Sequence, residues 1–192
     1  MTDTPPPGRP AAARDYQDWA PYSDLEEAAA AYLRDPDVAM EALRRVIDVA
    51  TIKAFVMERT LEQEHSRESL YQEVAVTDGR TLLLWMGNDV LAADDPDPGA
   101  PLLMSTLRSI ALSALTDRVL KIWYGADGTG RRSLHSVELR LITSTPDHTI
   151  AETPSRTETY CDELRFMKSV TDGGRAQMER LAQFGRVITA HG

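Results

Sequence analysis

Residues 70–86 read Leu-Tyr-Gln-Glu-Val-Ala-Val-Thr-Asp-Gly-Arg-Thr-Leu-Leu-Leu-Trp-Met, with an Asp-Gly pair between two apolar runs. Aspartate followed by glycine readily adopts the positive φ angles that a two-residue hairpin turn requires. Valine, tyrosine and tryptophan in the flanking runs are residues typical of strands. The sequence therefore predicts a β-hairpin, with strands at 70–77 and 80–86.

Further strand signals follow this hairpin and predict an antiparallel meander. An acidic, proline-rich stretch at 87–101 predicts an exposed loop, and a polar stretch at 144–156 with two prolines predicts another. Apolar residues return between and after these loops in short runs that suit strands. The expected strands lie at 107–115, 119–124, 134–143 and 157–167.

Two helices are expected before the hairpin. Ser23 is followed by acidic residues, which predicts the start of a helix that ends near Arg34. Asp35 is followed by proline, which suits the first position of a second helix. Apolar residues then recur at spacings of three and four, which predicts a helix over Pro36–Leu61 with a wide apolar stripe.

The stripe on the second expected helix is the first candidate for a binding surface. A helix that is apolar over so much of its circumference is covered on two sides. The cover is either the layers of its own fold or a partner, such as a second copy of the chain. Four residues that widen the stripe are predicted to contact that partner: Val49, Ile52, Phe55 and Val56.

The chain is expected to divide into three parts. Residues 1–22 are rich in proline and small polar residues and are predicted to be disordered. Residues 23–68 are predicted to be helical. Residues 69–192 are predicted to form an antiparallel β domain that ends in a helix. Three aromatic residues of the first part are expected to dock on the body of the protein or on another protein: Tyr16, Trp19 and Tyr22.

This order of elements predicts the α+β class, with an N-terminal helical pair, a mostly antiparallel sheet or small barrel, and a C-terminal helix. The glycine pair at 173 and 174 predicts the start of that last helix. Strands and helices do not alternate along the chain as they do in parallel α/β folds, and no internal repeat is present.

Two segments of the β region resemble bacterial PH-like domains. Residues 74–84 resemble the hairpin of those domains, and residues 107–120 resemble the next pair of strands. The terminal helix is also in place, since such a helix plugs PH-like barrels. The resemblance covers roughly residues 70–190 and implies a binding scaffold that serves protein–protein assembly. Some PH domains bind phosphoinositides through a basic cluster on the first hairpin, whereas this turn offers only Arg80.

The charge of the chain disfavours two classes of partner. The formal net charge is −9. Residues 1–100 carry 9 basic and 20 acidic side chains, whereas residues 101–192 carry 12 basic and 10 acidic ones. An acidic surface repels nucleic acids and anionic membranes, so neither is expected as a partner. A basic partner protein would suit the acidic half.

Sequence patterns also bear on location. No apolar run reaches the ~20 residues that span a bilayer, and the N-terminus lacks the features of a secretory signal. Cys161 is the single cysteine, so no intrachain disulfide can form. A cytoplasmic location is expected.

Motifs of catalysis or metal binding are weak in this sequence. The four histidines do not occur in pairs at ligand spacing, and acidic neighbours of Cys161 disfavour a reactive thiolate. No catalytic, cofactor-binding or metal-binding residue is therefore assigned. Arg131 and Arg132, in a glycine-containing turn, are candidates for contact with an anion, although the tip of a solvated hairpin would look the same.

These observations favour a non-enzymatic binding or regulatory module that acts through protein–protein contacts and self-associates as a homodimer. The alternative is a small-ligand-binding protein or an enzyme, in which the sheet encloses an apolar cavity. Aromatic residues of the strands would line that cavity: Trp85, Trp123 and Tyr124.

Overall fold

The computed structural model describes residues 17–64, 67–90, 102–126, 128–153 and 156–190. Its helices and strands follow one another along the chain as α1 (Leu25–Tyr32), α2 (Pro36–Arg44), the short 3-10 helix η1 (Val49–Thr51), β1 (Ala54–Glu64), β2 (Arg67–Thr77), β3 (Thr81–Val90), β4 (Leu102–Ala111), a second 3-10 turn η2 (Leu112–Ala114), β5 (Leu115–Ala126), β6 (Arg132–Thr153), β7 (Arg156–Ser169) and α3 (Gly174–Thr189). The predicted α+β class, with its N-terminal helical pair and C-terminal helix, is confirmed.

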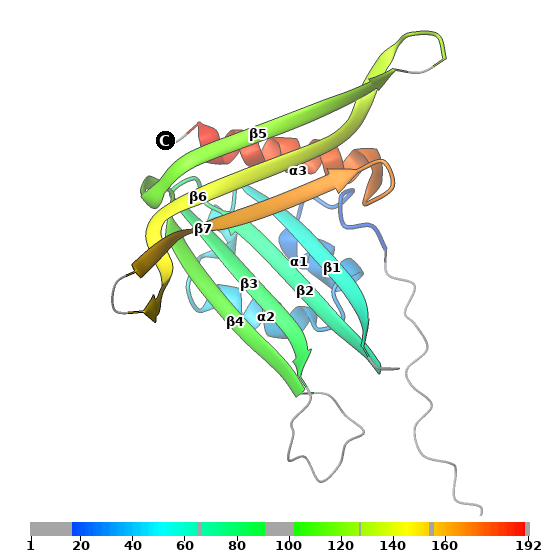
Figure 1. Cartoon of the computed structure of the whole chain (residues 1–192). Helices are drawn as coiled ribbons and strands as arrows, with labels where there is room; N and C mark the ends of the chain where they lie inside the picture. Colours follow the sequence, from blue (N-terminus) through cyan, green and yellow to red (C-terminus); the bar gives the residue numbers. More distant parts are fainter. Residues whose placement is uncertain (1–16, 65–66, 91–101, 127, 154–155, 191–192) are drawn as a thin grey trace, which may run out of the picture.

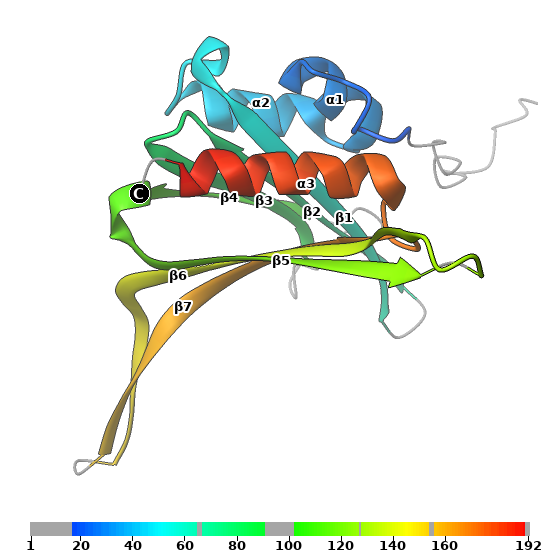
Figure 2. The same cartoon turned by 90° about the horizontal axis from the view of Figure 1, so that it is seen from above.

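The strands form two antiparallel sheets rather than one. The first has the order β1-β2-β3-β4, and the second has the order β5-β6-β7. Figure 1 shows the strands of the second sheet crossing over those of the first. In Figure 2, α1 and α2 lie on one side of α3 and the three-stranded sheet lies on the other.

The predicted hairpin at 70–86 is confirmed as β2 and β3. Asp78 fixes the turn, because its Oδ1 atom accepts hydrogen bonds from the backbone N–H groups of Arg80 and Thr81, both at 2.7 Å. Gly79 has a φ of 87°, in the left-handed region that favours glycine. The Asp-Gly pair thus lies in the turn as expected, but Thr77 pairs with Leu82, so the turn spans four residues rather than two.

The second predicted helix is too long. It ends at Arg44 rather than Leu61, and the chain continues through η1 into strand β1. The side chain of Asp48 accepts the N–H of Ala50 and so starts η1. From Ala54 onward the backbone pairs with β2 instead of with itself. A continuous apolar run fits a buried strand as well as a buried helix, so spacing alone does not distinguish them.

Two expected loops also differ from the structure. Residues 144–153 continue β6 and pair with β7 across several register shifts, so most of the predicted loop at 144–156 is strand. Residues 87–90 belong to β3, and β4 begins at Leu102 rather than at 107. The rest of the predicted acidic loop, 91–101, lies outside the described residues. Backbone pairing with a neighbouring strand outweighs the local signals of polar residues and proline here.

The N-terminal segment docks on the body of the protein. This is one of the two outcomes expected for its aromatic residues. Trp19 is fully buried, and its ring centroid lies 5.9 Å from that of Phe55. The N–H of Gln17 donates to the carbonyl of Ala31 at 3.2 Å. Tyr22 is half-buried. The described residues 17–22 of the predicted disordered tail are therefore packed on the body, and residues 1–16, including Tyr16, lie outside the described residues.

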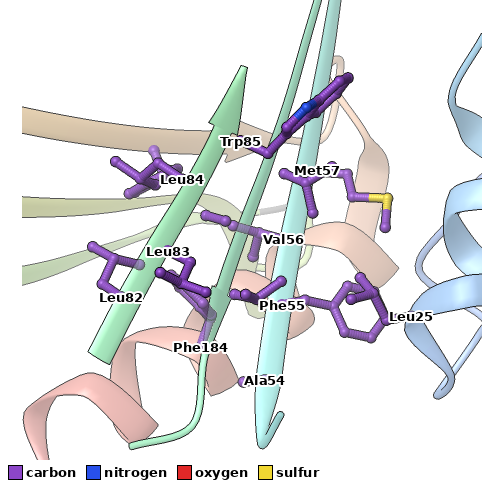
Figure 3. Close-up of a cluster of buried hydrophobic side chains, with 14 of the residues drawn as sticks. Leu25, Ala54, Phe55, Val56, Met57, Leu82, Leu83, Leu84, Trp85 and Phe184 are labelled. Carbon is purple, nitrogen blue, oxygen red and sulfur yellow. The ribbon is translucent and has the colours of Figure 1, made fainter. Parts of the chain in front are cut away.

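One continuous core joins both sheets and the three helices. Figure 3 shows the consecutive buried side chains that β1 and β3 contribute to this core. Consecutive side chains of a strand point to opposite faces of the sheet, so both faces of these strands are covered. The last helix enters this core through Phe184, whose ring lies 6.0 Å from that of Phe166 on β7. Gly185 allows α3 to approach the sheet, since a Cβ atom there would lie 3.1 Å from Leu120.

An ion pair links β1 of one sheet to β7 of the other. The Nζ atom of Lys168 lies 2.5 Å from Oε2 of Glu58 and 3.6 Å from Oδ1 of Asp172, which precedes α3. The side chain of Lys168 is only 3% exposed. Burial raises the pKa of Glu58, and the charge and hydrogen bond of Lys168 oppose this rise. The pair therefore holds two charges in place that would each be costly to bury alone.

A second ion pair fastens the N-terminal helices to the four-stranded sheet. The guanidinium of Arg34, between α1 and α2, donates to both oxygens of Asp89 on β3, at 2.8 and 2.6 Å. Asp89 also accepts the N–H of Leu70 on β2. Burial alone would raise the pKa of Asp89, but the bonds from Arg34 and Leu70 and the charge of Arg34 hold that pKa below its usual value.

Lys168→Met is expected to lower the free energy of unfolding by about 3 kcal/mol, because it leaves the Glu58 carboxyl buried without its partner. The double variant Glu58→Leu/Lys168→Met should recover most of this loss, since the buried charge is then gone as well. Urea unfolding followed by circular dichroism measures both. Equal stability of the single variant and the wild type would show that the pair does not stabilise the fold.

Asp89→Asn is expected to lower the free energy of unfolding at pH 7 by about 2 kcal/mol, since charge-assisted hydrogen bonds are lost. Because the pKa of Asp89 is lowered in the folded state, its stabilising effect is complete above the pKa of an unfolded aspartate. The effect disappears as the pH falls below that value through the folded pKa. Unfolding curves from pH 7 to pH 2.5 should therefore converge for the two proteins, and a constant difference would contradict this.

Candidate protein-binding surface

Strand β4 forms an open edge of the four-stranded sheet. In the described part of the chain its only strand neighbour is β3, and Figure 1 shows it at the outer side of the sheet. The opposite edge strand, β1, is protected, because α3 packs against it and Glu58 joins it to β7. An edge strand exposes a row of unpaired N–H and C=O groups that can pair with another strand.

The features that usually protect an edge strand are weak in β4. Its register with β3 is regular from Leu102 to Ala111, without a bulge, and Arg108 is its single charged residue. Strand β5, an edge of the other sheet, has two register shifts in its pairing with β6. It also carries three charged residues: Asp117, Arg118 and Lys121. Bulges and charges hinder edge-to-edge pairing, so β4 is the more receptive strand of the two.

Apolar side chains are exposed on the first half of β4. The side chains of Leu102 and Met104 are 54% and 49% exposed. They lie two residues apart and so project from the same face of the sheet. Leu103, Ser105 and Leu107 alternate with them toward the other face. Large apolar residues at a regular, uncharged edge mark a site of association rather than a solvated loop.

A groove of about 370 Å³ lies between β4 and α2. Leu107 and Ser105 form its wall on the strand. Residues one turn apart on α2 and just after it form the opposite wall: Val38, Glu41, Ala42, Arg45 and Val46. Val38 and Val46 are exposed. The groove lies on the face of β4 from which Ser105 and Leu107 project, whereas Leu102 and Met104 project from the opposite face, so the two apolar areas adjoin along the edge of the strand. We call the edge and the groove together the β4–α2 surface.

The charges beside the groove balance each other. Glu41 and Arg45 form an ion pair one turn apart on α2. The chain as a whole carries a net charge of −9, and its excess of acidic side chains lies in residues 1–100. Like charges repel two copies of an acidic protein over most of its surface. The β4–α2 surface is a place where a second copy could approach without that repulsion.

The four residues predicted to bind a partner do not share a helical stripe. Val49 lies in η1 and Ile52 follows it, and both are half-buried. Phe55 and Val56 lie in β1 and are each 3% exposed, so in the folded chain they belong to the core rather than to an accessible surface. Val49, Ile52 and Phe55 instead line a pocket beside α3.

The other residues singled out in the sequence are widely separated. Arg131 and Arg132 are exposed at the turn between β5 and β6. Trp85 is fully buried on β3 and donates its indole N–H to Ser105 at 2.9 Å. Trp123 and Tyr124 are exposed on the other sheet. These three aromatic residues therefore do not surround one enclosed cavity.

Sequence reasoning identified only part of the β4–α2 surface. Val38, Ala42 and Val46 belong to the apolar stripe that the spacing revealed, but the predicted helix carried that stripe on into residues that lie in η1 and β1. The run Leu102-Leu103-Met104 could have shown that β4 begins earlier than predicted. That β4 is an edge strand follows from strand order, which a single sequence does not specify.

Tyr71 and Glu73 form a polar pair on β2. The hydroxyl of Tyr71 donates to Glu73 at 2.6 Å on β2. Burial raises the pKa of Glu73, and this bond partly offsets the rise. Across the described residues, no group of three or more His, Cys, Asp or Glu side chains is placed to hold a metal ion.

Comparison with protein-family models, with curated proteins and with solved structures found no match to this chain. Among the helices that the structure describes, none combines the length and the apolar character needed to cross a membrane.

Proposed function

We propose that this chain is a non-enzymatic binding module that self-associates through the β4–α2 surface. The observation that carries the proposal is the open, regular and nearly uncharged edge of β4, with Leu102 and Met104 exposed along it. Pairing with a strand of another chain would satisfy the backbone groups at this edge and cover the apolar side chains.

A second copy of the chain suits this surface as the partner. In a two-fold dimer the same patch meets itself, so it must be self-complementary. Two β4 strands related by such an axis run antiparallel, as all neighbouring strands of the sheet already do. The groove carries one acid and one base, Glu41 and Arg45, which can each meet the opposite charge of the other copy.

A binding scaffold of the PH-like kind remains part of the proposal. It is supported by the order of the elements, since two antiparallel sheets are followed directly by α3. Such a scaffold needs no catalytic constellation, and its function then depends on its surfaces. The β4–α2 surface supplies the contact between copies in this proposal.

The variants Met104→Lys and Val46→Lys test the proposal, because lysine at an edge strand or in an apolar groove opposes association. We expect the wild type to be dimeric in sedimentation velocity experiments. Each variant should weaken the dimer at least about tenfold, which corresponds to ~1.4 kcal/mol. Val170→Lys is a matched control, since Val170 is 50% exposed but lies after β7, and it should remain dimeric.

Hydrogen exchange of the wild type at high and low protein concentration locates the contact. Amides of β4 should become protected at high concentration, whereas those of β5 should not change. A wild type that is monomeric at all concentrations would overturn self-association. A dimer that all three lysine variants leave intact would place the contact elsewhere.

A further inference from the structure

A pocket of about 370 Å³ lies on the β1 side of the four-stranded sheet, away from β4. It forms where the start of α1, the segment from η1 to β1, and the middle of α3 come together. Val49 and Ile52, both half-buried, provide the apolar wall, and Arg180, Lys53 and Gln183 provide polar groups. This volume is within the range of sites for small ligands.

Arg180 is the distinctive group of this pocket. Its guanidinium carbon lies 4.5 Å from the centroid of the Phe55 ring and 5.9 Å from that of Trp19. Because Trp19 and Phe55 are both buried in the core, they hold the guanidinium on a rigid aromatic support. Stacking of this kind positions an arginine while leaving its N–H groups available.

The charge of Arg180 is not neutralised by the described residues. Its side chain makes no hydrogen bond or ion pair with any of them, and burial lowers its pKa. In contrast, six other arginines pair with acidic side chains: Arg34, Arg44, Arg45, Arg140, Arg165 and Arg175. In a chain with 30 acidic and 21 basic side chains, an unpaired and half-buried arginine points to a missing anion.

A second cation stands beside the same pocket. Lys53 is exposed at its edge and has no ion pair with a described residue. Among the described residues that line the pocket, Asp24 is the one carboxylate. Its Oδ1 atom already accepts the N–H groups of Glu26 and Glu27, at 2.9 and 3.0 Å, and so caps α1. The pocket therefore keeps an excess of positive charge above an apolar wall.

We propose that this pocket binds a small organic carboxylate, with the carboxylate on Arg180 and Lys53 and an apolar body against Val49 and Ile52. A planar carboxylate matches the paired N–H groups of a guanidinium, and such bidentate bonds are stronger than neutral ones. The apolar wall favours a ligand with a hydrocarbon portion over a bare inorganic anion. The site is separate from the β4–α2 surface, so it does not depend on the proposed dimer.

Isothermal titration calorimetry of the full chain with 3-phenylpropionate tests this site, with 3-phenylpropionamide and inorganic phosphate as comparison ligands. We expect 3-phenylpropionate to bind at least about tenfold more tightly than either one, since the amide lacks the charge and phosphate lacks the apolar body. Equal affinity for phosphate, or no heat from any of the three, would overturn the proposal.

Substitutions then assign the binding to this pocket. Arg180→Gln should weaken 3-phenylpropionate binding at least about tenfold, and Lys53→Gln should weaken it severalfold. Lys53 is exposed, so that variant tests the site even if Arg180→Gln fails to fold. Arg186→Gln is the matched control, since Arg186 is exposed further along α3, and it should bind as the wild type does. Unchanged binding by Lys53→Gln and by a folded Arg180→Gln would place the ligand elsewhere and refute the assignment.

Discussion

The two sheets meet around the ion pair of Glu58 and Lys168, which an apolar core shared by both sheets surrounds. These residues are far apart in the sequence, yet their charged atoms lie 2.5 Å apart where β1 meets β7. Because Lys168 is buried, its charge must stay close to the Glu58 carboxylate, and this constrains how β1 and β7 cross. Asp172 adds a weaker contact at 3.6 Å and ties the start of α3 to the same point.

This junction also explains why the two edges of the four-stranded sheet differ. At β1 the ion pair connects the strand to β7, and α3 packs against it, so that edge is covered. A pocket lined by Arg180 lies beside this edge. At β4 no comparable contact occurs within the described residues, and the edge remains open next to α2. The two proposed binding sites thus lie at opposite edges of one sheet, which allows a ligand at one and a second copy at the other.

Charge separates these two sites as well. The β4–α2 surface carries a balanced pair, Glu41 and Arg45, and its attraction for a partner comes from backbone pairing and apolar contact. The pocket instead has an excess of positive charge within an acidic chain. Salt should therefore screen ligand binding more strongly than association, because screening acts on net charge and has little effect on apolar burial.

The sequence by itself determined the α+β class, the hairpin at 70–86 and the last helix, because turn residues and helix starts act over a few neighbouring positions. It also marked Val49, Ile52, Phe55 and Val56 as apolar, but spacing placed them on a helix. Only the tertiary structure made β1 a strand, since pairing with β2 outweighs local preference in a continuous apolar run. Strand order then decided that β4 is an open edge, and the packing of α3 against β1 brought Arg180 onto Phe55. Neither could be predicted, because contacts between distant segments leave no periodic signal in one sequence.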